Sequence, residues 1–330
     1  MPWWIYAAFV VLIAALIIFD LCVLHRGSHK VSMRTALTWT CVWVSIAMLF
    51  NVFVYALYEG WILKEWIPPD HVNGAEAAME FFTAYLIEYS LSVDNIFVIA
   101  MIIQAFRVPL EHQHRLLFWG IAGAAVLRGI MIYAGSAMVN NFDWTMYLFG
   151  GLLIYSAIRM GTADEESFDP QKSVVMKIAR RLFPVTTEFD GKKFFTIQNG
   201  KRYATPMFLA VVLIESCDVM FAVDSIPAVF GITKDPFIVF TSNIFAILGL
   251  RTLYFALAGL MADFHYLKKA LVVLMIFVGI KMLLTNHYHI PTNISLAIIA
   301  VILTVGVVAS LLHKPPVAIK SEDEEQPPHA

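Results

Sequence analysis

The amino-acid sequence predicts an all-α, polytopic membrane protein with about nine transmembrane helices and two inverted three-helix repeats. Of its 330 residues, 59% are hydrophobic and 15% are charged, against about 25% charged in ordinary soluble domains. That leaves too little polar surface to coat a soluble globule. Cys22, Cys41 and Cys217 all lie in apolar stretches, so the sequence predicts no disulfide framework and no paired-cysteine metal site.

The expected helices follow apolar runs long enough to cross a hydrocarbon layer of about 30 Å. They cover residues 3–24, 36–58, 77–105, 116–138, 144–160, 205–232, 237–260, 270–285 and 293–312. The first run opens with Trp3 and Trp4, which suit a membrane interface, and it lacks the basic start and cleavage site of a signal peptide. We therefore expect it to be a retained helix.

The distribution of basic residues predicts the orientation. With the N-terminus outside, the inner loops and the tail hold most of the 23 Lys and Arg residues, and only Lys64 and Lys234 lie in outer loops. Because cytoplasmic loops carry the excess of Lys and Arg, we expect the N-terminus outside and the C-terminus in the cytoplasm.

These helices divide the chain into six segments. We expect two N-terminal helices in 1–76, a first repeat in 77–161, a cytoplasmic connector in 162–204, a second repeat in 205–285, a ninth helix in 286–312 and a disordered acidic tail in 313–330. The connector is predicted to hold a short amphipathic helix and a hairpin that turns at Asp190-Gly191 or at Asn199-Gly200.

The repeat rests on charged landmarks that recur in the same order. Glu88 and Asp94 match Asp218 and Asp224, Arg128 matches Arg251, and Arg159 matches Lys281. An odd number of helices per copy places consecutive copies in opposite orientations, which is a recurrent transporter plan. A second alignment stays open, because Leu213-Ile214-Glu215 also matches Leu86-Ile87-Glu88.

Five carboxylates fall near the middle of the third and sixth predicted helices: Glu88, Asp94, Glu215, Asp218 and Asp224. Each would cost about 2.5–3.5 kcal/mol if it faced lipid as an ion, so we expect them to face the protein interior. Only Arg128 and Arg251 are mid-span cations, and the excess of acids indicates a site that holds protons or recruits a cation. A structural alternative is that buried arginine–carboxylate bridges pin the repeats together.

Helix geometry constrains how these acids meet. In a regular helix, residues six apart differ by about 240° in direction and about 9 Å in height, so Glu88 and Asp94 diverge. Convergence on one ion predicts an unwound segment, and Pro227 favours this in the second copy by freeing the carbonyl of Val223. Neutral oxygens are available from Asn95, Ser225, Ser90, Ser92 and Asn243. Such oxygen donors favour Mg²⁺, Ca²⁺ or Mn²⁺.

Two stretches carry a family resemblance: EYSLSVDNIFV, and the run FAVDSIPAVFGITKDPFIVFTSNIFAILGLR that ends at Arg251. They resemble the TerC family of bacterial integral membrane proteins, in particular its Alx-like members, and the similarity covers nearly the whole chain. The family is named for tellurite resistance, and several members are implicated in manganese efflux. The resemblance implies relatedness to LysE-like transporters, an inner-membrane location, and an acidic motif at Glu88, Asp94, Asn95, Glu215, Asp218 and Asp224.

The leading expectation is an inner-membrane exporter of Mn²⁺. Its midplane site would comprise Glu88, Asp94, Asp218 and Asp224, assisted by Glu215 and Asn95 and ordered by Arg128 and Arg251. The expected partners are membrane lipid, the divalent cation and protons; we expect no nucleic acid, no permanent cofactor and no enzymatic activity. The alternatives are a membrane scaffold that acts through loop 161–204 in a tellurite-resistance or secretion complex, and a proton-conducting protein without metal specificity.

Overall fold

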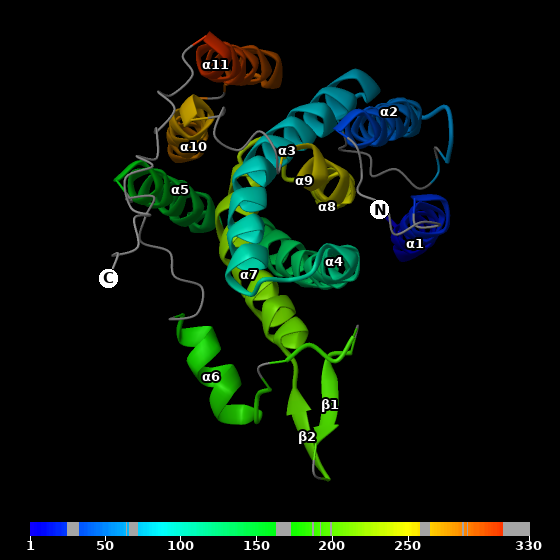
Figure 1. Ribbon diagram of the computed structural model, residues 1–330. Helices are drawn as coiled ribbons and strands as arrows, with labels where there is room; N and C mark the ends of the chain where they lie inside the picture. The colour runs from blue at the N-terminus through cyan, green and yellow to red at the C-terminus, as the bar shows by residue number, and fades with distance from the viewer. Residues whose placement is uncertain are drawn as a thin grey trace.

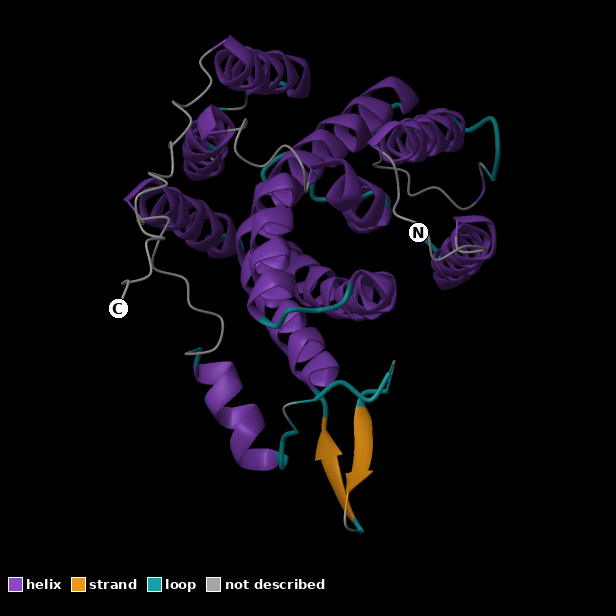
Figure 2. Ribbon diagram, in the orientation of Figure 1, coloured by secondary structure: helices purple, strands orange, loops and turns teal. Residues whose placement is uncertain are grey.

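The computed structural model describes residues 1–24, 33–63, 65, 72–162, 173–186, 188–191, 193–198, 200–257, 265–285, 287–288 and 290–312. That part of the chain is built from helices and one small hairpin (Figures 1 and 2). The elements are α1 (Trp3–Leu24), α2 (Met33–Tyr58), α3 (Gly74–Ala105), α4 (Leu110–Asn141), α5 (Trp144–Thr162), α6 (Val174–Leu182), β1 (Phe195–Gln198), β2 (Lys201–Ala204), α7 (Pro206–Phe230), α8 (Pro236–Leu248), α9 (Leu250–Leu257), α10 (His265–Leu284) and α11 (Thr292–Leu312).

The predicted all-α membrane architecture is confirmed. Six stretches of the described chain are long and apolar enough to cross a membrane, namely α2, α3, α4, α7, the stretch Pro236–Phe255 and α11. Helices α1, α5 and α10 occupy the other three predicted spans. Nine crossings, the two inverted repeats and the six-segment division stay predictions.

Two helices differ from their predicted ranges. Helix α4 covers Leu110–Asn141 rather than 116–138, since hydropathy marks only the apolar part of a helix whose backbone hydrogen bonds continue into polar sequence. The predicted helix 237–260 is divided at Gly249 into α8 and α9. Glycine is a weak helix former, and the interruption falls where the helix meets the side chains of Tyr89 and Trp43.

The central helices pack in a reciprocal manner. Helix α3 packs on α8, α4 packs on α7, and α3 also contacts α7 at the centre of the molecule (Figure 1). Helix α5 packs closely on α10, where a Cβ on Gly150 would lie 2.9 Å from the carbonyl oxygen of Gly279. Small residues at such a crossing allow close backbone approach between helices in a membrane. In the two predicted repeats, α3 and α7 are the first helices, α4 and α8 the second, and α5 and α10 the third. Each first helix thus packs on the second helix of the other repeat, the two first helices contact each other, and the two third helices pack together.

Three apolar clusters hold these helices together. The first includes Ile87, Ile132 and Val229, and the second includes Ile96, Leu116 and Leu213. Along α3, α4 and α7 the first cluster lies toward one end of each helix and the second toward the other. The third cluster attaches α1 and α2 to α8 through phenylalanine rings such as Phe50 and Phe245, whose centroids are 4.8 Å apart.

The connector is a small folded unit rather than an extended linker. The Ser173 side chain caps α6 by accepting a hydrogen bond from the Met176 amide at 3.2 Å. Strands β1 and β2 pair antiparallel from Phe195↔Ala204 to Gln198↔Lys201 (Figure 2). Both the predicted amphipathic helix and the hairpin at 199–200 are therefore confirmed. Gly200 has φ +73°, a conformation that glycine adopts without strain.

The connector docks on the ends of α4 and α7. Met176 and Ala179 of α6 belong to the second apolar cluster, and the ring of Phe189 lies 6.3 Å from that of His112. Arg115 lies over the ring of Phe194 at 5.2 Å. In the exposed turn before β1, hydrogen bonds from Thr196 and Lys193 hold the pKa of Asp190 below its usual value.

Candidate functional site

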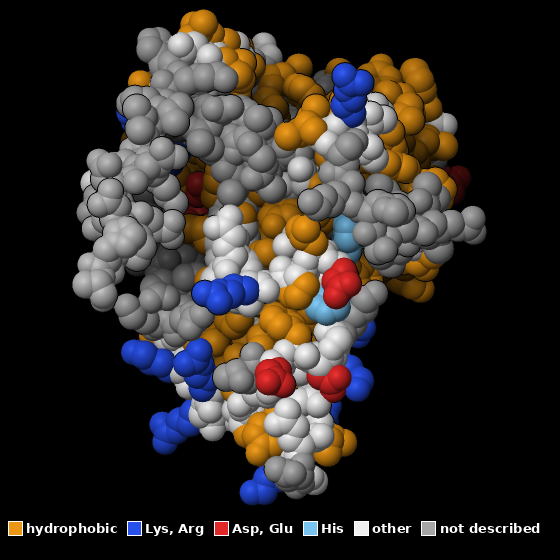
Figure 3. All heavy atoms as spheres, viewed as in Figure 1, with side chains coloured by type: hydrophobic (Ala, Val, Ile, Leu, Met, Phe, Trp, Pro, Cys, Tyr) orange, Lys and Arg blue, Asp and Glu red, His pale blue; other side chains and the backbone are white. Residues whose placement is uncertain are grey.

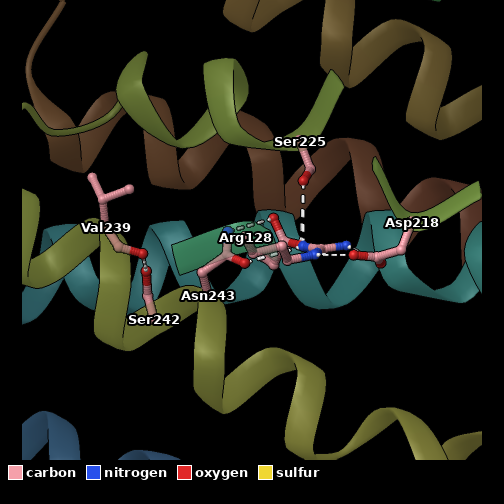
Figure 4. A network of polar contacts seen from close by, with 7 residues as sticks. Arg128, Asp218, Ser225, Val239, Ser242 and Asn243 are labelled. Atoms are coloured by element: carbon pink, nitrogen blue, oxygen red, sulfur yellow. Dashed lines mark hydrogen bonds and ion pairs between the residues drawn. The ribbon is translucent and has the colours of Figure 1, made fainter. Parts of the chain in front are cut away.

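A buried arginine lies where α3, α4, α7 and α8 meet. The Arg128 side chain, from the middle of α4, has no exposed surface. Its Nε and Nη2 atoms donate to the Asp218 carboxylate on α7 at 3.2 Å and 3.0 Å, which is a bidentate arrangement (Figure 4). The Nη1 atom forms an ion pair with Glu88 of α3, whose side chain is also fully buried. One guanidinium thus joins carboxylates from both predicted repeats.

Two neutral side chains complete the network. Asn243 of α8 accepts from Arg128 Nη1 at 3.1 Å through Oδ1 and donates to Glu88 Oε2 at 3.1 Å through Nδ2. Ser225 of α7 accepts from Arg128 at 3.4 Å and donates to Glu88 Oε1 at 3.3 Å. Figure 4 shows Asp218 and Ser225, both of α7, and Asn243 of α8 converging on the guanidinium. We call Glu88, Arg128, Asp218, Ser225 and Asn243 the Arg128 network.

The Arg128 network carries more negative than positive charge. Two carboxylates face one guanidinium, so the ionised set has a formal charge of −1 in a region that excludes water. Burying such charges costs several kcal/mol per ion unless hydrogen bonds satisfy them, and here Ser225 and Asn243 supply those bonds. The arrangement therefore has the capacity to attract one further cation or proton.

A narrow pocket adjoins the Asp218 side of the network. Its cavity volume is about 20 Å³, room for about one water-sized occupant. The pocket is lined by Asn95, Ile99, Leu117, Gly120, Ile121, Ala124, Ile214, Asp218, Phe221, Ile247, Leu250 and Tyr254. Asn95 is 4% exposed, and its side-chain nitrogen has no hydrogen-bond partner in the described part of the chain. Asn95, Asp218 and Tyr254 are thus the polar residues of a mostly apolar pocket.

Glu215 lies one helical turn before Asp218 on α7. Its carboxylate packs against Gly123 of α4, in the space that a Cβ at that position would occupy. Its Oε2 atom is buried and accepts no hydrogen bond from the residues that the structure describes. A Cβ at position 123 would therefore displace the Glu215 carboxylate, whose Oε2 has coordinating capacity that the described residues leave unused.

One of the two remaining predicted acids, Asp224, contacts α5. Asp224 of α7 accepts a hydrogen bond of 2.5 Å from Ser156 of α5, and Asp94 of α3 is partly buried. Among the described residues, no three His, Cys, Asp or Glu side chains are grouped so that they could hold a metal ion. The Arg251 side chain lies outside the described residues. The assignment of the six motif residues as metal ligands stays a prediction.

The expected unwinding of the helices is wrong. Helix α3 continues from Gly74 to Ala105 and α7 from Pro206 to Phe230, without a break between the paired acids. Pro227 removes one backbone hydrogen bond, the one to the carbonyl of Val223, and α7 continues through it to Phe230. The acids diverge as regular helices require, with Glu88 and Asp218 turned toward Arg128 and Asp224 turned toward α5.

Two functional contacts were not identified from the sequence. Ser156 as the partner of Asp224 and Gly123 as the partner of Glu215 depend on helix packing. The available signal for Ser156 was the one serine within the apolar run LLIYSAIRM. No signal distinguished Gly123 from other glycines in the same helix.

The fold and the network define the class: an all-α, polytopic membrane protein with a buried ion-pair network at a four-helix junction. The chain belongs to the integral membrane protein TerC family, which it matches over residues 73–317. The family assignment expected from the sequence motifs is therefore confirmed.

Three relatives illustrate the similarity. The chain is 45% identical to the uncharacterized membrane protein STKORF319 of Myxococcus xanthus, over 93% of this chain and 92% of that protein. It is 42% identical to Alx of Escherichia coli K12, provisionally named a membrane-bound redox modulator, over 89% of this chain and 90% of that protein. It is 39% identical to an uncharacterized membrane protein of Rickettsia bellii, over 93% and 96% of the two chains. No solved structure matches the chain.

Proposed function

We propose that the protein exports a divalent metal cation, Mn²⁺ in the first place, across the bacterial inner membrane. The observation that carries this proposal is the Arg128 network, in which two buried carboxylates share one guanidinium. Ionisable groups inside a membrane protein are costly and commonly mark ion pathways. The family resemblance, in which several members are implicated in manganese efflux, supports Mn²⁺ over Ca²⁺ and Mg²⁺.

In the proposed mechanism, Arg128 forms ion pairs with Glu88 and Asp218 when no metal is bound. An arriving cation replaces the guanidinium between Glu88 and Asp218, and the amide oxygens of Asn95 and Asn243 supply neutral ligands. These oxygen donors suit hard divalent cations. Glu215, one turn from Asp218 and without a hydrogen bond at Oε2, adds a carboxylate on the pocket side.

Asp94 and Asp224 flank this centre in the proposed pathway. Asp94 follows Glu88 by six residues on α3, and Asp224 follows Asp218 by six residues on α7. With α3 and α7 running in opposite directions across the membrane, Asp94 lies on the cytoplasmic side and Asp224 on the outer side. Each acid would then bind the cation transiently on its way between the Arg128 network and one face of the membrane.

The pocket beside Asp218 corresponds to the cytoplasmic approach in this scheme. Its lining residues come from the same ends of α3, α4 and α7 as the second apolar cluster, and the first cluster packs on the other side of the Arg128 network. Alternating access would open the first cluster and close the pocket. Proton binding to Glu88, Asp218 or Glu215 would release the cation from the site and couple its export to the proton gradient.

The test is a flux assay on purified protein in liposomes loaded with a Mn²⁺ indicator. We expect Mn²⁺ movement by the unaltered protein and near-background movement for Asp218→Asn, which keeps the side-chain shape but removes the charge. Glu111→Gln is the matched control, since Glu111 is exposed near the start of α4. Absence of flux in the unaltered protein, or full flux in Asp218→Asn, would contradict the proposal; Ca²⁺, Mg²⁺ and protons are assayed in parallel.

Two functions other than cation export, a redox role and a scaffold role, are tested by substitutions elsewhere in the chain. For a redox role like the one named for Alx, the exposed free cysteine of α2, Cys41, is the thiol to replace, whereas Cys217 is buried in α7. The scaffold function is favoured by one observation, the folded connector. Substitutions on its exposed surface test this better than deletion, because deletion would also remove Met176 and Ala179 from the second apolar cluster.

A further inference from the structure

Helix α6 has an exposed apolar stripe. Val174, Ile178 and Leu182 follow one another at intervals of four residues, which places them on one face of the helix. Their exposed fractions are 69%, 54% and 68%, far above those of apolar side chains in a packed core. Three large aliphatic side chains on a nine-residue helix thus face away from the protein.

The position of α6 is fixed by its opposite face. Met176 is fully buried and Ala179 is 6% exposed, and both belong to the second apolar cluster beside α7. The exposed stripe therefore does not arise from an undocked helix free to rotate. Its orientation away from the helical bundle is set by packing.

Basic side chains border the apolar stripe. Lys177 and Arg181 are exposed and lie within about 100° of Ile178 around the helix, whereas Arg180 is exposed on the opposite face; the sequence VVMKIARRL contains no acidic residue. Figure 3 shows a group of Lys and Arg side chains at the lower left of the molecule, in the region that α6 occupies in Figure 1. An apolar face beside a basic face is the pattern of a helix that lies in a membrane interface containing anionic lipid.

We propose that α6 is a lipid-binding element that rests on the anionic cytoplasmic leaflet. Val174, Ile178 and Leu182 enter the boundary between headgroups and acyl chains, and Lys177 and Arg181 contact lipid phosphates. The occupant is lipid rather than a protein because basic side chains adjoin the exposed apolar stripe and no acidic residue lies on the helix. This inference does not depend on the transported ion.

The test reports the surroundings of residue 178 in the full-length protein. A fluorophore sensitive to polarity is attached to Ile178→Cys in a background of Cys22→Ser, Cys41→Ser and Cys217→Ala, and the protein is placed in nanodiscs. We expect blue-shifted emission and quenching by acyl-chain nitroxide lipids in nanodiscs of phosphatidylcholine with phosphatidylglycerol. Since one basic side chain near an anionic surface favours binding about fivefold, Lys177→Gln with Arg181→Gln should lower the equilibrium constant for lipid contact roughly thirtyfold.

The matched control carries the fluorophore at Gln198→Cys, an exposed position at the end of β1. It should keep water-exposed emission in every nanodisc. An unquenched label at 178 would overturn the proposal, and so would equal quenching in anionic and in pure phosphatidylcholine nanodiscs. A blue shift that appears only when two copies share a nanodisc would assign the stripe to self-association instead.

Discussion

Replacement of Arg128 by methionine tests the central role of the Arg128 network. The change removes the cation but keeps a long side chain, so Glu88 and Asp218 remain buried without their shared partner. Removal of one member of a buried ion pair costs about 3–5 kcal/mol, because it leaves an uncompensated charge. In a chain of this size that loss corresponds to a fall in Tm of about 5–10 °C.

The assay is thermal unfolding of purified protein in detergent or nanodiscs, followed by intrinsic tryptophan fluorescence. Arg34→Met is the matched control, since Arg34 is exposed at the start of α2 and should change Tm little. The triple variant Arg128→Met, Glu88→Gln and Asp218→Asn should recover most of the lost stability, because it removes all three charges together. A Tm for Arg128→Met equal to that of Arg34→Met, or a triple variant less stable than Arg128→Met alone, would refute the reasoning.

Three further changes probe neighbouring contacts by the same unfolding assay. Ser156→Ala removes the donor to Asp224, and the loss of a hydrogen bond to a charged group should cost about 1.5–3 kcal/mol; an unchanged Tm would argue against this contact. Gly123→Ala should destabilise by about 1–3 kcal/mol through overpacking against the Glu215 carboxylate, whereas Gly151→Ala, with open space around it, should be neutral or stabilising; equal effects would contradict the packing argument. Tyr58→Phe removes the 2.6 Å hydrogen bond to the N-cap carboxylate of α8 and should cost about 1.5–3 kcal/mol; retention of full stability would refute that role.

Much of the fold follows from properties that the sequence states directly. Long apolar runs predict the spanning helices, and the polar connector predicts α6 and the hairpin, because its turn residues and its alternation of charge and apolar residues are local signals. The helix ends were less predictable. Helix α4 extends beyond its apolar run, and the break at Gly249 depends on neighbours from distant parts of the chain.

The site was partly predictable for the same reason. The cost of burying charge indicates that Glu88, Asp218 and Arg128 face the interior, and the structure places them together. Which acid meets which cation depends on helix rotation and crossing, and the sequence contains neither. The expected unwinding failed because it assumed that Asp94 and Asp224 join the same centre. Regular α3 and α7 need no such break, and Asp224 meets Ser156 instead.

The members of the Arg128 network are synthesised at different times. Glu88 and Arg128 are made early, whereas Asp218 follows Arg128 by 90 residues and Asn243 follows it by 115. At translation rates of roughly 5–20 residues per second, the first two side chains precede Asp218 by several seconds at least. During that interval Glu88 and Arg128 are available to each other, and their pairing alone would be neutral. The network thus acquires its negative charge only when α7 is inserted, so the protein need not hold an uncompensated charge in the membrane before its fold is complete.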